Sequence, residues 1–294
     1  MTGRVALVTG AARGIGAATT KLLAGQGYSV LALDWCAGDE RPAGAGASAI
    51  PYRMPTTADL DEVVNDAARS VPMITGTFHP HDVKSAGDHG SGASEVVPYV
   101  ADVRDRAALE AAVAYTVQRW GRLDVAVAAA AVLLGGRPLW ETPPAELETL
   151  WEIDVLGVWN TAAATVPAML ANPEPAGCRF VAVASVAAGH GLFRLAGYNA
   201  AKHAVVGIVK GLAADLVGTG VTAAAVSPGS TRTEMLTHTA SIYELEDLDV
   251  FAEHQLSRRL LEPAEIAAAI AFCCSRAGAA VNGSVIEATD GFTG

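Results

Sequence analysis

Runs of basic residues and long apolar stretches are both missing from this 294-residue sequence. It has 20 Lys+Arg against 31 Asp+Glu and a formal net charge of −11, so its field repels nucleic-acid phosphates and anionic lipids. The most apolar stretch, VAVAAAAVLL at 125–134, is about half as long as a membrane-spanning helix, and the N-terminus lacks a signal peptide's apolar core. We expect a cytoplasmic protein that binds neither nucleic acid nor membrane.

Metal-ligand patterns are lacking as well. The four cysteines have no metal-type spacing and are most simply core residues: Cys36, Cys178, Cys273 and Cys274. One Gly-rich stretch holds three histidines: His79, His81 and His89. An HxH pattern without a third ligand nearby is more often part of a polar loop, so we predict no metal site.

Strand-like and helical segments alternate along the chain. Apolar strand-like runs lie at 5–10, 28–34, 96–103, 123–132, 178–185, 221–229 and 283–291, with helical segments between them. The strands are apolar throughout instead of alternating with polar residues, which is typical of a parallel sheet covered on both faces. We predict an α/β fold with a Rossmann-type doubly wound parallel sheet, in a single domain over 1–294.

One connection in this predicted sheet is unusually long. Asp34 and Asp102, at the ends of the second and third strands, are separated by far more sequence than one helix and two loops need. Stretches rich in Gly, Ala and Pro flank ADLDEVVNDAARSV, which is amphipathic enough for a helix with Asp59 near its start. We predict an insertion over about 38–94.

The stretch TGAARGIG at 9–16 has the spacing of a dinucleotide-binding turn. It follows a strand and opens a helix, so backbone N–H groups at Gly10, Gly14 and Gly16 could hold a pyrophosphate. Asp34 comes about 20 residues later, where a carboxylate accepts the ribose hydroxyls and repels a 2′-phosphate. The pattern favours NAD, although Arg13 in the loop could instead reach the extra phosphate of NADP.

Three polar residues form a predicted catalytic set. Tyr198 and Lys202, in YNAAK, share one face of a helix, and an ammonium near a phenol lowers the phenol pKa so that it can take a proton from an alcohol. Ser185 ends the preceding strand and can hydrogen-bond the substrate oxygen. These groups converge where open α/β sheets bind ligands.

Two more motifs complete the set: ADV at 101–103 and SPGSTRT at 227–233. With TGAARGIG, Asp34, ADV, Ser185, YNAAK and SPGSTRT in this order along the chain, the sequence resembles the short-chain dehydrogenase/reductase family over almost its whole length apart from about 40–92. The resemblance implies that Asp102 and Val103 bracket the adenine, that Lys202 also binds the nicotinamide ribose, and that three residues flank the carboxamide: Pro228, Gly229 and Thr231. Tyr198 would also touch the cofactor, and further cofactor contacts are expected at Ile15, Trp35 and Ala129.

Two positions depart from the family pattern. Where the family usually has Asn-Asn-Ala-Gly after the fourth strand, this chain has AAAA at 128–131. Where the family usually has a catalytic Asn, this chain has Asp154. Asp154 could hold the water of the family's proton relay through the lysine, or it could be a buried acid that pairs with Lys202.

The insertion supports a narrower resemblance. Its PY and DL elements, Pro51, Tyr52, Asp59 and Leu60, resemble the mycofactocin-associated branch of the family. That resemblance implies that the insertion covers NAD, which stays bound and is reoxidised in place by the redox carrier mycofactocin. Alternatively, the insertion is a surface loop or an oligomer contact.

We therefore expect an NAD-dependent alcohol dehydrogenase that oxidises a hydrophobic alcohol. The alternatives are a carbonyl reductase with exchangeable NAD(P), such as a 3-oxoacyl reductase, and a non-catalytic NAD-binding regulator. Residues 232–260 are expected to cover the substrate, and the predicted apolar pocket includes Leu192, Phe193, Leu236, Ile242, Tyr243, Leu245 and Phe251. A homotetramer is implied by the family resemblance alone.

Overall fold

The computed structural model describes residues 3–38, 50–70 and 94–293. The Gly-rich flanks of the predicted insertion, with the three histidines His79, His81 and His89, lie outside the described residues. The helix expected between these flanks is present as α2, Thr57–Ser70.

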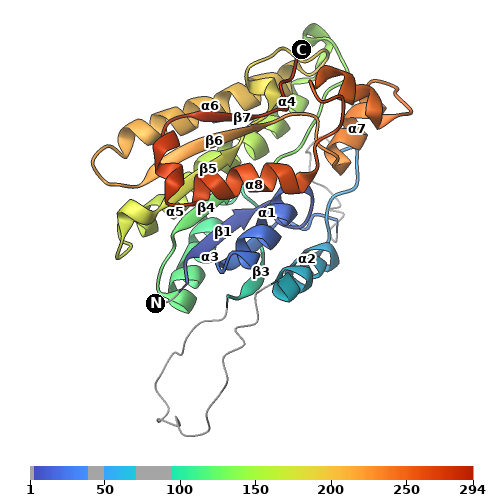
Figure 1. Ribbon diagram of the computed structural model, residues 1–294. Helices are drawn as coiled ribbons and strands as arrows, with labels where there is room; N and C mark the ends of the chain where they lie inside the picture. Colours follow the sequence, from blue (N-terminus) through green and yellow to red (C-terminus); the bar gives the residue numbers. More distant parts are fainter. Residues whose placement is uncertain (1–2, 39–49, 71–93, 294) are drawn as a thin grey trace, which may run out of the picture.

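Seven parallel strands form the sheet, in the order β3-β2-β1-β4-β5-β6-β7 (Figure 1). They are β1 Val5–Thr9, β2 Ser29–Asp34, β3 Val96–Val100, β4 Val125–Ala128, β5 Arg179–Val183, β6 Thr222–Pro228 and β7 Val285–Ala288. The strand order reverses between β1 and β4, and in such sheets this reversal opens a crevice at the carboxyl ends of the strands. The predicted doubly wound α/β fold is confirmed.

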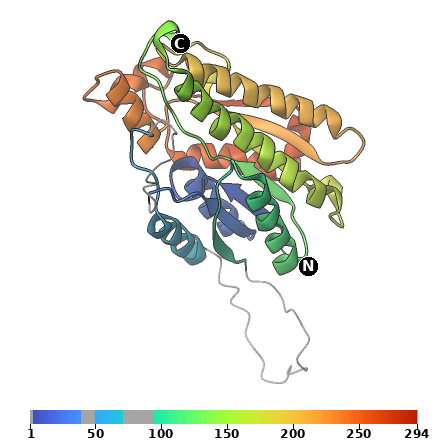
Figure 2. The ribbon, with the colours of Figure 1, turned by 180° about the vertical axis from the view of Figure 1, so that it is seen from behind.

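Helices cover both faces of the sheet, as Figures 1 and 2 show from opposite sides. One layer holds α1 Gly14–Gly25, α2 and α8 Pro263–Cys274, and the other holds α3 Arg106–Trp120, α5 Gly157–Leu170 and α6 Ala196–Asp215. Strand residues alternate between two cores: Ala6 and Val8 pack toward α1 and α8, whereas Leu7 packs toward the other layer. Because both faces are buried, both alternating positions are apolar.

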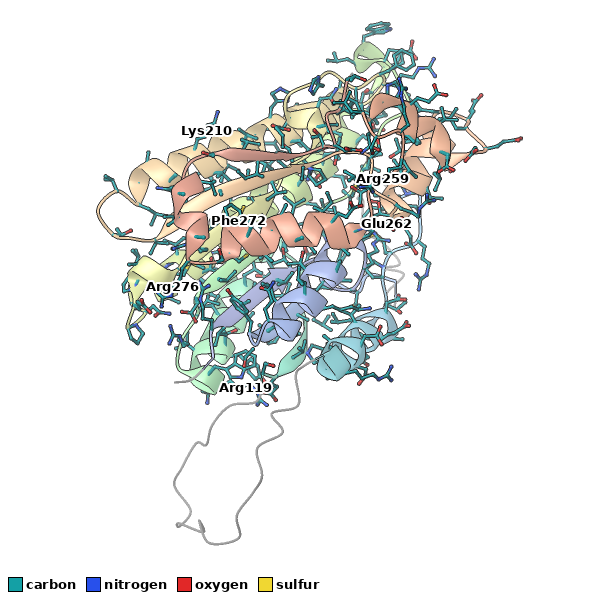
Figure 3. All side chains as sticks on the ribbon, viewed as in Figure 1. Arg119, Lys210, Arg259, Glu262, Phe272 and Arg276 are labelled. Carbon is teal, nitrogen blue, oxygen red and sulfur yellow. The ribbon has the colours of Figure 1, made fainter. Side chains whose placement is uncertain are left out.

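The remaining elements lie mostly around the carboxyl ends of the strands. They are α4 Pro144–Leu150, the π-helical turn η2 Trp151–Leu156, α7 Glu234–Ile242, and the 3₁₀ helices η1 Leu139–Glu141, η3 Pro175–Gly177, η4 Val186–Ala188, η5 Leu248–His254 and η6 Ala277–Val281. In Figure 3, Arg259 and Glu262 lie near α7, whereas Arg119 and Arg276 lie at the opposite end of the sheet. The segment 232–260, which we expect to cover the substrate, contains α7 and η5.

Residues Pro144–Leu170 form a helical stretch long and apolar enough, by length and composition alone, to cross a membrane. About half of its most apolar window, 56%, is buried against the rest of the structure. The stretch is also interrupted by η2, which places the carboxylate of Asp154 in the interior. Its packing is that of a core helix in an α/β fold.

Candidate active site

A cavity of about 1230 Å³ opens at the carboxyl ends of the strands. Its wall runs from the glycine loop between β1 and α1, past Asp34, to Ser185 and Tyr198. This volume exceeds that of a typical single-ligand pocket, so a dinucleotide and a small substrate can share it.

The glycine loop has the close packing that a phosphate-binding turn requires. Gly10 and Gly14 have φ angles of +68° and +54°, which favour glycine. A Cβ on Gly10 would lie 2.7 Å from the backbone nitrogen of Ala130, and one on Gly16 would collide with the carbonyl oxygen of Gly10. Helix α1 begins directly at Gly14 and has no side-chain N-cap, so its first N–H groups suit an anionic ligand.

Asp34 is buried at the end of β2, where the cavity wall begins. Its two carboxylate oxygens accept hydrogen bonds from the backbone N–H groups of Ala12 and Cys36, each at 3.1 Å. Burial raises the pKa of Asp34, while the two backbone donors and the Arg13 charge oppose this shift. The site therefore fits an adenosine ribose with free hydroxyls.

Arg13, which could have contacted a 2′-phosphate, is engaged elsewhere. Its guanidinium donates to Glu234 Oε2 at 2.9 Å and to the carbonyl oxygen of Arg53, and it lies 5.3 Å from the Tyr52 ring centroid. An arginine held by these groups is poorly placed to attract a phosphate, which removes the main sequence argument for NADP.

The predicted adenine side of the cavity is organised by a residue that the sequence did not single out. Arg104 donates to Asp102 Oδ2 through Nε at 2.8 Å, and its guanidinium lies 4.4 Å from the Trp35 ring centroid. Asp102, Val103 and Trp35 all line the cavity, as expected. Arg104 therefore fixes Asp102 and Trp35 relative to each other.

The structure brings the three predicted catalytic residues together. Tyr198 and Lys202 are buried on one face of α6, and the Lys202 Nζ lies 5.5 Å from the Tyr198 ring centroid. Ser185 stands two residues beyond β5, as the N-cap of η4, and lines the same cavity. Burial raises the pKa of Tyr198, whereas the Lys202 charge and the Ser185 hydroxyl lower it.

Asp154 pairs directly with Lys202. Its Oδ2 lies 3.2 Å from Lys202 Nζ, and its Oδ1 accepts a hydrogen bond from the Val132 backbone N–H at 2.8 Å. This is the second of the two arrangements expected from the sequence. Among the described residues, the structure gives Oδ2 no partner besides the Lys202 ammonium. A role in a proton relay stays a prediction.

The alanine stretch 128–131 is compensated by neighbouring side chains. The Thr9 Oγ1 accepts hydrogen bonds from the backbone N–H groups of Ala129 and Ala130, at 3.1 and 3.2 Å. Just beyond this stretch, the Leu133 N–H donates to the Tyr52 hydroxyl at 3.1 Å. The sequence indicated neither contact, because both partners are remote along the chain. Ala129 lines the cavity, as predicted.

On the far side of the crevice, the end of β6 supplies the expected carboxamide-binding stretch. Pro228, Gly229 and Thr231 line the cavity. A Cβ on Gly229 would lie 2.7 Å from the Thr289 carbonyl oxygen, so only glycine fits there. Ile15 also lines the cavity wall, so the residues present fit the predicted dinucleotide along its whole length.

The substrate half of the cavity is apolar. Its wall includes every predicted residue and several more: Leu192, Phe193, Leu195, Met235, Leu236, Ile242, Tyr243, Leu245, Val250 and Phe251. The Tyr243 hydroxyl donates to the Phe193 carbonyl oxygen at 2.7 Å and so ties the end of α7 to the loop before α6. The Met235 sulfur lies 3.9 Å from the Tyr198 hydroxyl.

Residues 50–56, called the strap below, run between α7 and α2 (Figures 1 and 2). Met54 and Pro55 line the cavity next to the cofactor side. Arg53 donates to Asp59 Oδ1 at 2.7 Å and to Glu234 Oε1 at 3.2 Å, while the Tyr52 ring stacks on His238 with centroids 4.5 Å apart. The strap is therefore attached to both neighbouring helices.

The chain matches two related family models. Residues 4–76 match the family model described as short chain dehydrogenase, and residues 80–293 match the related model described as Enoyl-(Acyl carrier protein) reductase. The second description names the family model and not the reaction of this chain.

Individual relatives agree with this match. An uncharacterized NAD-dependent oxidoreductase of Mycobacterium tuberculosis is 34% identical over 255 residues, covering 86% of this chain and 78% of that protein. The (-)-trans-carveol dehydrogenase of Rhodococcus erythropolis is 30% identical, covering 80% and 73%. The crystal structure of carveol dehydrogenase from Mycobacterium avium in complex with NAD has a TM-score of 0.82 at 26% identity, covering 99% of this chain and 98% of that chain.

Proposed function

The chain belongs to the short-chain dehydrogenase/reductase family, and on that premise we propose that it is an NAD-dependent dehydrogenase that oxidises a hydrophobic alcohol to its carbonyl. The observation that carries this proposal is the placement of Ser185, Tyr198 and Lys202 in the same cavity as Asp34. The similarity to dehydrogenases named for carveol, a cyclic alcohol, supports the direction and the apolar substrate.

The chain's own residues provide the acid–base part of the reaction. The Ser185 hydroxyl holds the alcohol oxygen, and Tyr198, as the phenolate, accepts the alcohol proton. Lys202 favours the phenolate through its positive charge, which lowers the Tyr198 pKa against the effect of burial. When bound, NAD supplies the hydride acceptor.

A direct test supplies the purified protein with NAD, an artificial electron acceptor and a set of cyclic and linear secondary alcohols. Carbonyl product should form with the wild type and not with Tyr198→Phe, while both proteins keep the same thermal unfolding midpoint. Full activity in Tyr198→Phe would refute the catalytic assignment. If the protein instead reduces a ketone to its alcohol with added NADPH and no other electron carrier, a carbonyl reductase with exchangeable cofactor would be favoured.

We further propose that NAD stays bound during turnover and is reoxidised by mycofactocin. The strap supports this proposal, because its contacts with α2 and α7 would have to break together before the covered half of the cofactor could leave. Retained NAD cannot serve as an ordinary exchangeable substrate, so a second electron acceptor is needed. The homotetramer and the cytoplasmic location stay predictions.

Denaturing the purified protein and assaying the supernatant for NAD tests retention. We expect close to one NAD per chain, little stimulation by added NAD, and turnover once a carrier such as mycofactocin or an artificial electron acceptor is supplied. Protein without NAD that turns over steadily on added NAD would refute retention and leave the dehydrogenase proposal intact.

A further inference from the structure

The loop after β4 is held by three side chains that come from different parts of the chain. Thr9 on β1 binds the N–H groups of Ala129 and Ala130, and Asp154 binds that of Val132. Tyr52 on the strap binds the next one, that of Leu133. The amides held by Asp154 and by Tyr52 are therefore adjacent in the chain.

Tyr52 is well placed to hold this loop. Its ring is stacked on His238, and the Arg13 guanidinium lies 5.3 Å from the ring centroid, so two neighbours restrain the ring that carries the hydroxyl. Burial raises the pKa of Tyr52 to about 12, and the charges of Asp154 and Tyr198 also act on it. The hydroxyl therefore stays neutral, within electrostatic reach of the catalytic residues.

We infer that Tyr52 is a positioning residue for catalysis: its hydroxyl fixes the β4 loop so that the Val132 N–H keeps Asp154 against Lys202. Removing the hydroxyl deprives the Leu133 N–H of this acceptor, and Leu133 is itself a buried residue, so the loop loses one of its fixed contacts. A loosened Leu133 would release the neighbouring Val132, and with it the amide that orients the carboxylate. This inference rests on the proposed dehydrogenase function.

The same contact would couple the insertion to the chemistry. The strap reaches the β4 loop through Tyr52 and reaches α7 through His238 and Glu234. A strap lifted from the cavity would therefore leave the loop unsupported, so that the catalytic residues are fully ordered only while the strap is closed. In this chain the insertion supplies the support that the alanine stretch cannot give by its own side chains.

The first test removes only the hydroxyl, in Tyr52→Phe, and follows amide hydrogen exchange in peptides covering 129–135. Exchange should be at least about fivefold faster than in the wild type, because the Leu133 N–H has lost its acceptor. Tyr28→Phe is the matched control, since it removes a buried hydroxyl that accepts from Arg4 at 2.6 Å at the other end of the sheet. Unchanged exchange at 129–135 in Tyr52→Phe would overturn the inference.

The second test measures alcohol oxidation in the same variants. We expect kcat to fall about tenfold in Tyr52→Phe, with its pH profile displaced toward lower pH, and to stay at the wild-type level in Tyr28→Phe. The displacement follows because a weakened amide donor leaves Asp154 less charged, which removes negative charge from the surroundings of Tyr198. A wild-type kcat and pH profile in Tyr52→Phe would overturn the positioning role even if exchange is faster.

A double-mutant cycle separates positioning from general loosening. If Tyr52 acts through Asp154, adding Tyr52→Phe to Asp154→Asn should displace the pH profile no further than Asp154→Asn alone. Additive displacements would overturn the inference while leaving the dehydrogenase function in place. Failure of the wild type to oxidise any alcohol would instead refute the proposed function itself, with the exchange measurement unaffected.

Discussion

The Asp154 carboxylate lies 3.2 Å from the Lys202 ammonium, and both side chains are buried beneath the catalytic cavity. Burial raises the pKa of Asp154. Burial alone would lower the pKa of Lys202, but the Asp154 carboxylate and Tyr198 together outweigh burial and raise that pKa. Lys202 therefore stays charged, while Asp154 partly cancels the effect of this charge on Tyr198. The pair therefore acts on the Tyr198 pKa through two opposing charges.

Asp154→Asn should leave kcat within tenfold of the wild type and displace its pH profile toward lower pH. Asparagine can still accept from the Val132 N–H, but it removes the negative charge that raises the Tyr198 pKa. The rate of oxidation should then rise at a lower pH, because the phenolate forms more readily. The measurement is kcat from about pH 6 to pH 10. A superimposable profile would remove Asp154 from any part in the proton transfer.

Ser185→Ala should lower kcat for alcohol oxidation by roughly 10² to 10³, with a smaller change in KM. In the proposed reaction the hydroxyl holds the substrate oxygen, and it also lowers the Tyr198 pKa, so its removal should weaken both orientation and base strength. Ser185→Thr is the matched variant because it keeps the hydroxyl, and it should recover much of the rate. An equal loss of kcat in both variants would mean that the packing around residue 185 matters and that its hydroxyl does not.

Much of the fold and part of the site could be predicted from local sequence. The apolar strands predict a buried parallel sheet because both of their faces need cover, and the glycine spacing predicts the turn at Gly10–Gly16 because a Cβ would block it. Tyr198 and Lys202 are recognisable because their spacing matches one helical turn.

Contacts between remote segments could not be predicted in this way. Nothing near Thr9 or Tyr52 in the sequence indicates that they hold the backbone after β4, since these hydrogen bonds arise from the order of strands and the path of the strap. The ion pair between Arg13 and Glu234 could not be predicted either, because it depends on the start of α7 lying next to the glycine loop, and the two residues are remote in the sequence.

Asp34→Ala should raise the Kd for NAD by about 10- to 100-fold and reduce the preference for NAD over NADP. In the proposed cofactor site, the substitution would remove the acceptor for the ribose hydroxyls and the charge that repels a 2′-phosphate. Cofactor-depleted protein is needed for this measurement, with both cofactors titrated at the same salt concentration. An unchanged preference would mean that Asp34 serves only the backbone N–H groups of Ala12 and Cys36.

Arg53→Ala should speed NAD release a few-fold, because it breaks the contacts of the strap with both Asp59 and Glu234. Each contact is exposed and screened by solvent, so the expected effect is modest and should shrink at high salt. Arg69→Ala is the control: it removes an exposed ion pair with Asp66 on the same helix, α2, without touching the strap. Release is followed by dilution of the NAD-loaded protein, and equal rates in both variants would refute the strap as a barrier.

The capping box at the start of α2, where the strap ends, should lose its stabilising effect only at low pH. Thr56 Oγ1 accepts from the Asp59 N–H at 3.2 Å, and Asp59 Oδ2 accepts from the Thr56 N–H at 2.7 Å. Partial burial favours the neutral acid, but hydrogen bonds from Arg53 and Thr56 lower the Asp59 pKa to about 2. Since the unfolded value is about 3.9, this stabilisation is complete above about pH 4 and is lost as the pH falls through about 2.

Asp59→Ala tests this pH dependence. At pH 7 the variant should unfold at a Tm about 2–4 °C lower than the wild type, because the helix loses its cap and Arg53 loses its main partner. The difference in Tm should narrow as the pH is lowered from 4 toward 2, since the wild-type carboxylate then becomes protonated and loses its bond to Arg53. Glu62→Ala is the control, as it removes an exposed acid from the same helix. A difference that stays constant down to pH 2.5 would show that the Asp59 charge contributes nothing to holding the strap.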